Sequence, residues 1–557
     1  MNRRSIVVSA LVSLVAVLIG YSQLSPVVPT LAEKMPPGAL LFVEAANLGG
    51  LLSEWSGSRE KTEWLRSANY EAFLRSGLLG RLDGASTEFT QASGVANDWN
   101  FLTSVAGAQS AMAIYDIGNM KFIYVSRLPS AKLAQSKIWQ ARTSYSTRTA
   151  SGKNYFVKSD GPSRRTACLA SDGDLLILTT DESLMAATLA QLASPTGSLR
   201  SQPWFSAAWN PAEGNSELHM VFNLNDLVKT PHFRSYWVQQ NVSQLNQFSA
   251  GASSLARQAA SWTESRILLR NEPLTAAIKS PLNSLANAMP QNAGFYKAWS
   301  APEPEELAAL IGYRLLGGKQ QAAIHYNSAP AEAGVTESGN SGDLETRIDD
   351  APMKEASAGF NRESWLRFFA RNVPRSALAI GGTRPGPDGV FTTTESAIVI
   401  EFDKPLVGDE WTGAMVESME GLHSVSRLGL RWQLRRTRSN AYQALEGLLP
   451  LYGSQIGSRV ILSNSETLLA EVISATGAAP MALDASTIYF AQFRHGKERP
   501  AFGQLMRMID SAPTPGALFS ENLASLSNVL RRFDSATVVR RDLGDRLLET
   551  VTYRIAP

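Results

Sequence analysis

Three sequence blocks recur in the same order along this chain of 557 residues. The paired blocks are Met35–Phe42 with Val373–Ile380, Gly173–Ala186 with Gly457–Ala470, and Ala309–Pro330 with Ala536–Pro557. Chance similarity of short strands could explain one pair, but three collinear pairs indicate an internal duplication. The number of residues that separates a block from its partner decreases from the first pair to the third. We therefore expect the first copy to be the longer one.

The blocks contain turn signals that are typical of antiparallel hairpins. Asp172-Gly173 and Gly118-Asn119 each separate two short apolar runs, which predicts two-residue hairpin turns. In the third block, Gly317-Gly318 and Gly544-Asp545 occupy the same place between alternating segments. We therefore expect an α+β chain with two tandem related copies, each a mainly antiparallel sheet with flanking helices, behind an N-terminal membrane segment.

The middle block predicts a strand that runs directly into a capped helix. Leu175–Leu178 and Val460–Leu462 are apolar runs. Each is followed by the spacing of a capping box, Thr179-x-x-Glu182 and Ser463-x-x-Glu466, in which the first residue caps the helix.

Two stretches of the first copy have apolar residues at helical spacing, from about Leu51 to Leu82 and from about Phe233 to Trp262. These helical insertions could cover a ligand cavity, although simple core packing is the more common reason for such spacing. The expected organisation is residues 1–32 as leader, 33–330 as the first copy with two helical insertions, 331–357 as linker and 358–557 as the second, shorter copy.

A stretch without charged residues, Ser5–Ala32, follows Arg3 and Arg4. Positive residues before an apolar run hold the N-terminus inside, so the remainder should face the periplasm or the outside. The run suits a cleaved signal peptide, with small residues around Ser22 and Ala32, and Ser5–Leu24 could also span a membrane as an anchor. Both alternatives stay open.

Composition excludes some classes of protein. Hydrophobic residues make up 44% of the chain and charged residues 18%, which is typical of a folded protein. The formal net charge is +2, and a nucleic-acid binder would need a concentrated basic surface. The single cysteine, Cys168, excludes an intrachain disulfide and lies in an apolar run, where a buried thiol is expected.

These motifs carry a resemblance. A leader, an opening strand of the form P-x-x-A-L at Pro36 and Pro374, and an apolar strand running into Glu182 or Glu466 at a helix start resemble uncharacterised bacterial extracytoplasmic (envelope) proteins of a domain-of-unknown-function family. The resemblance implies an extracytoplasmic location. It supplies no catalytic residues.

Chemical motifs are sparse. The five histidines are isolated, with no pair at the spacing of metal ligands, so no metal or cofactor is expected. Ser58-x-x-Lys61 matches a short hydrolase motif without its companion motifs and is interpreted as surface. One arginine cluster surrounds Trp432, and its members Arg431, Arg435, Arg436 and Arg438 are candidates for binding an anion. On an alternating strand, however, the cluster would split between two faces, and a solvated, ion-paired face is the alternative.

We therefore predict a non-catalytic binding or envelope-organising module, membrane-anchored or secreted to the periplasm. Its partners would be the membrane, through the N-terminal segment, and envelope proteins or an apolar or anionic ligand, with no nucleic acid. Two alternatives remain: a carrier of lipid or another apolar ligand, which predicts a continuous apolar cavity, and an extracytoplasmic hydrolase with no recognisable motif.

Overall fold

The structure is a computed structural model that describes residues 29–316, 360–419, 432–499 and 533–555, apart from short gaps. The gaps within these ranges are residues 59–60, 63–64, 66–76, 162–164, 196, 210–215, 232–244, 259, 275–281, 287, 291–292, 386–391, 437–440, 446–449 and 477–482. Residues 1–28 of the expected leader and the whole expected linker lie outside the described residues. The last residues of the expected leader are described, and Leu31 and Ala32 are buried. Within the described part of the chain, no helix has both the length and the apolar character needed to cross a bilayer.

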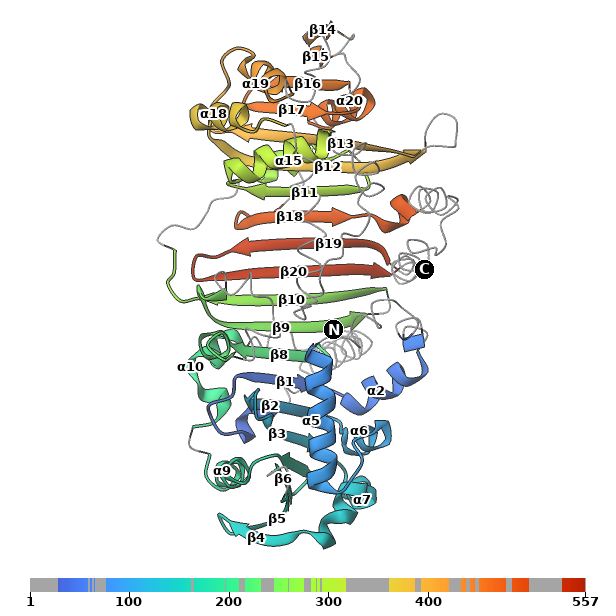
Figure 1. The fold of residues 1–557 in the computed structure, drawn as a ribbon, viewed down its shortest axis with the longest axis vertical. Helices are drawn as coiled ribbons and strands as arrows, with labels where there is room; N and C mark the ends of the chain where they lie inside the picture. Colours follow the sequence, from blue (N-terminus) through green and yellow to red (C-terminus); the bar gives the residue numbers. More distant parts are fainter. Residues whose placement is uncertain are drawn as a thin grey trace, which may run out of the picture. The chain divides into compact units, whose positions relative to one another are not determined.

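The fold is α+β, with antiparallel strands and flanking helices arranged in two compact units (Figure 1). The first unit comprises the described parts of Met1–Gly50 and Thr87–Asn223, and the second those of Leu51–Ser86 and Leu224–Pro557. Two helices contain points where the chain passes between the units, α2 (Leu48–Gly57) and α5 (Gly77–Ser93).

In the first unit the strands pair in the order β8-β1-β2-β3-β7-β6-β5-β4. Their bounds are β1 Leu41–Ala45, β2 Ser110–Asp116, β3 Lys121–Arg127, β4 Ser146–Ala150, β5 Lys153–Asp160, β6 Arg165–Asp172, β7 Leu175–Thr179 and β8 Leu218–Asn223. All of these pairings are antiparallel, because each strand returns through a hairpin or a longer connection.

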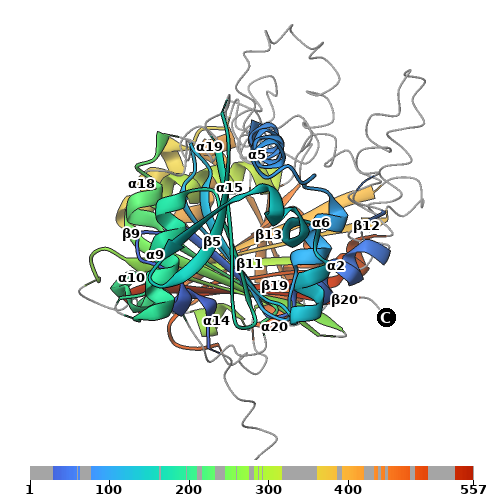
Figure 2. The ribbon, with the colours of Figure 1, turned by 90° about the horizontal axis from the view of Figure 1, so that it is seen from below.

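Helices cover both faces of this first sheet. They are η1 (Leu31–Lys34), α6 (Trp99–Val105), α7 (Ser130–Gln135), α8 (Lys137–Ala141), η2 (Arg142–Ser144), α9 (Glu182–Ala193), η3 (Leu199–Ser201) and α10 (Pro203–Ala208). Figure 2 shows α9 and α6 on opposite sides of the strands. The residues of β7 are buried on both faces, and Leu176 and Leu178 pack into the cluster that contains Phe101 of α6.

In the second unit the strands pair in the order β9-β10-β20-β19-β18-β11-β12-β13-β17-β16-β15-β14. Their bounds are β9 Phe248–Gln258, β10 Ser261–Arg270, β11 Phe295–Ser300, β12 Pro374–Pro385, β13 Thr392–Phe402, β14 Trp432–Arg436, β15 Ala441–Leu445, β16 Leu451–Ile456, β17 Arg459–Ser463, β18 Thr487–Phe493, β19 Phe533–Asp542 and β20 Arg546–Ile555. Helices of this unit include α11 (Leu224–Leu227), α14 (Leu282–Ala286), α15 (Pro304–Leu316), α18 (Glu363–Arg371), α19 (Glu410–Met419) and α20 (Glu466–Ala475).

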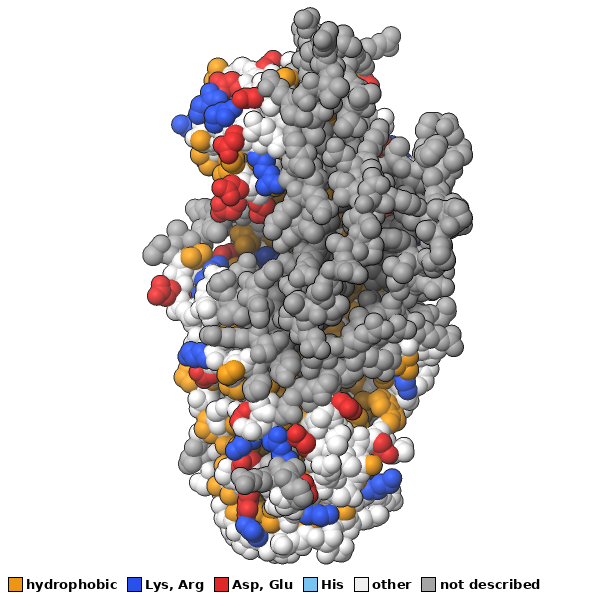
Figure 3. Space-filling view, in the orientation of Figure 1, with side chains coloured by type: hydrophobic (Ala, Val, Ile, Leu, Met, Phe, Trp, Pro, Cys, Tyr) orange, Lys and Arg blue, Asp and Glu red, His pale blue; other side chains and the backbone are white. Residues whose placement is uncertain are grey.

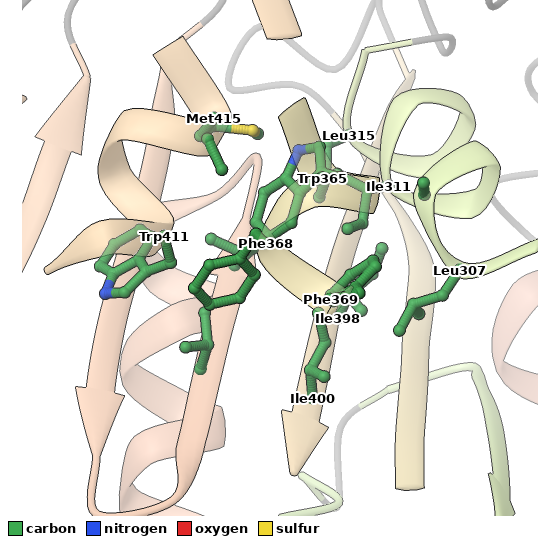
Figure 4. Packing of buried hydrophobic residues seen from close by; sticks show 14 of the residues in the cluster. Leu307, Ile311, Leu315, Trp365, Phe368, Phe369, Ile398, Ile400, Trp411 and Met415 are labelled. Carbon is green, nitrogen blue, oxygen red and sulfur yellow. The ribbon is translucent and has the colours of Figure 1, made fainter. Parts of the chain in front are cut away.

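The core of the second unit fills both faces of its central strands. Alternate residues of β12 point to opposite faces: Ala377 and Ala379 pack under α15, α18 and α19, while Leu378 and Ile380 pack against α14 and α20. Figure 4 shows the first of these clusters from close by. Its labelled side chains come from α15, α18, β13 and α19, and they are Leu307, Ile311, Leu315, Trp365, Phe368, Phe369, Ile398, Ile400, Trp411 and Met415.

The turn signals predict three hairpins correctly. β2 and β3 join around Gly118-Asn119, and β19 and β20 at Gly544-Asp545. β6 and β7 join at Gly173-Asp174, one residue after the predicted position, because Asp172 is still paired with Leu175. Gly173 and Gly544 have φ angles of 58° and 86°, a left-handed conformation that glycine adopts without strain.

Both capped helices exist, but the predicted capping residues are two positions too early. The N-cap of α9 is Asp181, whose carboxylate accepts hydrogen bonds from the backbone N–H groups of Ser183 and Leu184. The N-cap of α20 is Ser465, which accepts from Leu468 N–H. Thr179 and Ser463 remain in the strands and donate their hydroxyl hydrogens to the carbonyl groups of Asp181 and Ser465, which fixes the turn from strand to helix.

Two expectations of secondary structure are wrong. Phe248–Trp262, the described end of the second predicted helical insertion, forms β9 and the start of β10, because pairing with a neighbouring strand overrides the helical spacing of its apolar residues. Ala309–Leu316, predicted as the first strand of a hairpin, belongs to α15. There Leu307, Ile311 and Leu315 recur every four residues and bury one helix face.

Charged groups are mixed by sign on the surface. On the face drawn in Figure 3, blue and red side chains lie interspersed in the described parts of the chain. Ion pairs such as Arg367 with Glu417 account for some of this mixing. This ion pair joins Arg367 of α18 to Glu417 of α19 within the second unit.

Candidate ligand-binding pocket

The candidate site lies in the second unit, where β11 begins. Phe295 is the first residue of β11, and beyond it β12 continues with β13 alone as its neighbour. A cavity of about 390 Å³ occupies this place. It is lined by Phe295, Arg314, Gly381, Gly382, Thr383, Thr394, Phe493, His495, Glu498 and Arg499.

The carboxylate of Glu498 closes the exposed end of the sheet beside the cavity. Its Oε2 accepts hydrogen bonds from the backbone N–H of Thr383, at 2.9 Å, and from the Thr383 hydroxyl, at 2.5 Å. Gly294 leaves the space for this side chain, since a Cβ there would lie 1.7 Å from Glu498 Oε1. Glu498 thus accepts the hydrogen bond of Thr383 N–H that a backbone carbonyl would accept if β11 extended further. Its role here is structural.

Aromatic side chains form the apolar wall. Phe295 and Phe493 are direct cross-strand partners, with ring centroids 6.3 Å apart. The His495 ring packs against Phe493 at 4.4 Å. Burial, together with the positive charge of Arg499, holds the pKa of His495 below its usual range, so the imidazole is neutral at pH 7.

Two arginines bring positive charge to the cavity. The guanidinium carbon of Arg314, on α15, lies 5.3 Å from the centroid of the Phe295 ring, within the range of a cation–π contact. Arg499 donates from Nη2 to the carbonyl oxygen of Phe533 at 3.2 Å, while its Nε is buried without a hydrogen-bond partner among the described residues. The carboxylates near these cations are Glu498, which accepts hydrogen bonds from Thr383, and Asp534, whose charge also acts on His495.

Glycine at two successive positions of β12 makes room for the cavity. A Cβ at Gly381 would meet its nearest atom, the Glu395 carbonyl oxygen, only at 3.7 Å, so the backbone there is open to the cavity. Glycine inside a strand is a recognised signal of close approach by a ligand or another backbone. Ile380-Gly381-Gly382-Thr383 carries this signal in the sequence, and it could have pointed to the site.

A second cavity of about 400 Å³ lies between the end of α18 and the start of α19. Arg371 Nη1 lies 3.4 Å from Glu410 Oε2 there, so this cation is already ion-paired. Val407, on the connecting loop, is 90% exposed. This cavity therefore offers an open surface with compensated charge, and the cavity at β11 is the better candidate.

The arginines proposed from sequence lie elsewhere. Arg435 and Arg436 are consecutive residues of β14 and pair in register with Tyr442 and Ala441. Arg431 and Arg438 lie outside the described residues. The proposed anion site around Trp432 remains a prediction.

Other candidate groups have ordinary structural roles. Cys168 is buried in β6, as expected, and burial raises the pKa of its thiol to about 12, which makes it a poor nucleophile. His219 packs its ring 5.0 Å from that of Trp209. Within the described ranges, no three His, Cys, Asp or Glu side chains form a group that could hold a metal ion.

Comparisons with known proteins find little. No family model and no curated protein matches this chain. Among solved structures, crystal form I of TP0453 is similar over 48% of this chain and 89% of TP0453, at 13% identity and a TM-score of 0.24. Crystal form IV of the same protein is similar over 43% of this chain and 81% of TP0453, at 13% identity and a TM-score of 0.25. A similarity at this TM-score carries no argument about fold or function.

Proposed function

We propose that this chain is a non-catalytic, extracytoplasmic binding module of the bacterial envelope, and that the cavity at the start of β11 is its ligand-binding site. The observation that carries the proposal is the cavity itself: about 390 Å³, with aromatic walls and two arginines. Concave apolar sites with a few convergent polar groups are the usual form of a small-molecule site. The N-terminal apolar segment supports the extracytoplasmic location.

The same residues favour binding over hydrolysis. The neutral His495 packs against Phe493, and Glu498 is fixed by Thr383 through two hydrogen bonds. A Ser-His or Cys-His mechanism needs a hydroxyl or thiol nucleophile hydrogen-bonded to the histidine. The described contacts of His495 are instead with an aromatic ring and with the charges of Arg499 and Asp534.

Packing in the second unit also bears on the carrier alternative. Trp365, Phe368 and Phe369 are almost fully buried between α18 and the sheet, and they fill the space that a lipid carrier would keep open on this face. A compact ligand in the smaller cavity at β11 agrees better with this packing.

The proposal includes two related copies, with one change of alignment. In each unit a hairpin, β2–β3 or β12–β13, pairs with a strand that leads into a helix, β7–α9 or β17–α20. With Ile177 of β7 matched to Ile461 of β17, the strand registers match Ala111 of β2 to Leu378 of β12. This alignment replaces the pairing of Met35–Phe42 with Val373–Ile380, since β1 pairs with β2 and β8 whereas β12 forms the hairpin.

Native mass spectrometry of the full-length chain, purified from a bacterial host, tests the binding function. We expect a small-molecule adduct on the wild type that disappears in Gly381→Phe, because a phenyl ring at this position fills the cavity. Gly381→Ala is the matched control, since its Cβ makes only ordinary contacts. An adduct retained in full by Gly381→Phe would contradict the assignment of the site.

A further inference from the structure

Residues at the end of the expected leader are part of the core of the first unit. Leu31, Ala32 and Met35 are all 0% exposed. Leu31–Lys34 forms η1, which packs against η3, α9 and β2. The cleavage position that the sequence offers after Ala32 therefore lies inside the folded unit.

The carboxylate of Glu44, on β1, holds the start of this segment. Glu44 is 7% exposed, and its Oε2 accepts hydrogen bonds from the Thr30 hydroxyl and the Leu31 N–H, both at 2.8 Å. Its Oε1 accepts from Gln109 Nε2 at 3.1 Å, and the same amide nitrogen donates to the Pro29 carbonyl oxygen at 3.0 Å. Thr30 and Leu31 thus supply two of the three donors that the described contacts give this buried carboxylate.

The end of the segment is bound by two other elements. Gln191 of α9 donates from Nε2 to the Glu33 carbonyl oxygen at 3.3 Å. The Leu199 N–H of η3 donates to the Met35 carbonyl oxygen at 2.8 Å. The backbone is thus held on both sides of the peptide bond between Ala32 and Glu33.

From these contacts we infer that residues 29–35 stay in the mature chain and complete the first unit, and that the bond between Ala32 and Glu33 is not the processing site. This inference rests on the proposed extracytoplasmic location and adds where the processed chain begins. Its N-terminus lies upstream of Pro29, at Gln23 after cleavage behind Ser22, or at Met1 where the leader stays as an anchor.

The stability of the first unit favours retention of the segment. A chain cut after Ala32 would lose the Leu31 side chain from a closed core, which leaves a cavity, and would leave the buried Glu44 carboxylate with the Gln109 donor alone among those described. Both losses are destabilising, and cells degrade chains that spend more time unfolded. A product that begins at Glu33 would therefore not accumulate.

Mass spectrometry of the N-terminus of the full-length chain, expressed in a bacterial host, tests the processing site. We expect the accumulated product to begin at Met1 or near Gln23. Ser22→Leu removes the small residue that a signal peptidase needs at that position, and we expect this variant to retain Met1. A folded product that begins at Glu33, in the wild type or in Ser22→Leu, would overturn the inference while the proposed location stands.

Hydrogen exchange of the same products tests the contribution of the segment to the fold. Leu31→Ala should speed amide exchange in β1 and β2 at least about tenfold, because truncation of a core side chain lowers the free energy of opening. Glu33→Ala, at an exposed position of the same segment, should leave these rates within about twofold. Thr30→Val keeps the side-chain shape and removes the hydroxyl that Glu44 accepts, so we expect about fivefold faster exchange.

Thr30→Val decides the result if Leu31→Ala does not fold. Exchange rates unchanged by these two substitutions would overturn the inference, because a chain that lacks residues 1–32 cannot respond to either of them. An intact chain in the cytosol would overturn the proposed location. The exchange rates would then still decide whether residues 29–35 belong to the fold.

Discussion

At the scale of single residues, Gly294 determines whether Glu498 can close the end of β11. A Cβ at Gly294 would lie 1.7 Å from Glu498 Oε1, which is far inside the contact distance. We expect Gly294→Ala to displace the carboxylate and to lower the free energy of unfolding by about 2 kcal/mol, the usual cost of overpacking. Urea denaturation measures this change.

Gly413→Ala is the control for this prediction. Gly413 lies inside α19, and a Cβ added there would have no neighbouring atom within 4 Å, so alanine should stabilise the helix by roughly 0.5–1 kcal/mol. Equal unfolding free energies for Gly294→Ala and wild type would show that Glu498 does not occupy the place described.

A buried carboxyl group in the first unit makes stability depend on pH. Glu44 accepts hydrogen bonds from the Thr30 hydroxyl and Leu31 N–H, both at 2.8 Å, and from Gln109. Burial nevertheless raises the pKa of Glu44. Because the folded state holds the proton more tightly than the unfolded state, this group's contribution is fully present below the unfolded pKa and falls as the pH rises through the folded pKa.

The matched variant is Glu44→Gln, which has no titration at this position. We expect the stability difference, wild type minus variant, to increase as the pH falls from 7 and to level off below about 4.3, the unfolded pKa of glutamate. Urea denaturation across this pH range measures it. A difference that decreases on acidification would mean that the hydrogen bonds outweigh burial and that the pKa is lowered.

At the scale of elements, the start of α20 depends on Ser465. Its hydroxyl oxygen accepts from Leu468 N–H at 3.2 Å, and without it one of the first N–H groups of the helix loses its partner. Ser465→Ala should therefore cost about 1 kcal/mol in the free energy of unfolding. Thr467→Ala, at an exposed position of the same first turn, should be close to neutral. Equal effects of the two would contradict the cap assignment.

The elements that can be predicted best from sequence are those determined by local chemistry. Turns with glycine, such as the one that begins at Gly173, need a left-handed residue and are visible in the sequence. The predicted caps are displaced by two positions, because Thr179 and Ser463 satisfy the same spacing rule but hydrogen-bond within the turn. The strand β9 could not be predicted from periodicity, since its pairing partner β10 decides its conformation.

The candidate pocket could not be predicted from the sequence for a related reason. Phe295, Arg314, Gly381 and Arg499 come from four segments that are far apart in the sequence, and only the pairing of β11 with β12 and β18 brings them together. Gly381-Gly382 is the local signal that the sequence offers for this site. The arginine cluster around Trp432 was predicted instead, because its charges are adjacent in sequence.

At the scale of the whole molecule, the leader predicts where the chain resides. Expression of the full-length chain in a bacterial host, followed by membrane fractionation and mass spectrometry of the N-terminus, distinguishes the two alternatives. An intact Met1 in the inner-membrane fraction indicates an anchor, and an N-terminus near Gln23 or Glu33 in the periplasm indicates a cleaved signal. An intact chain in the cytosol would contradict the proposed location.

The most direct test of the central claim is a crystal structure of the full-length chain as purified from the bacterial host. The account predicts ligand density over Gly381, in contact with Phe295 and Phe493. A cavity filled by the chain's own side chains, or ligand density only in the cavity between α18 and α19, would contradict it.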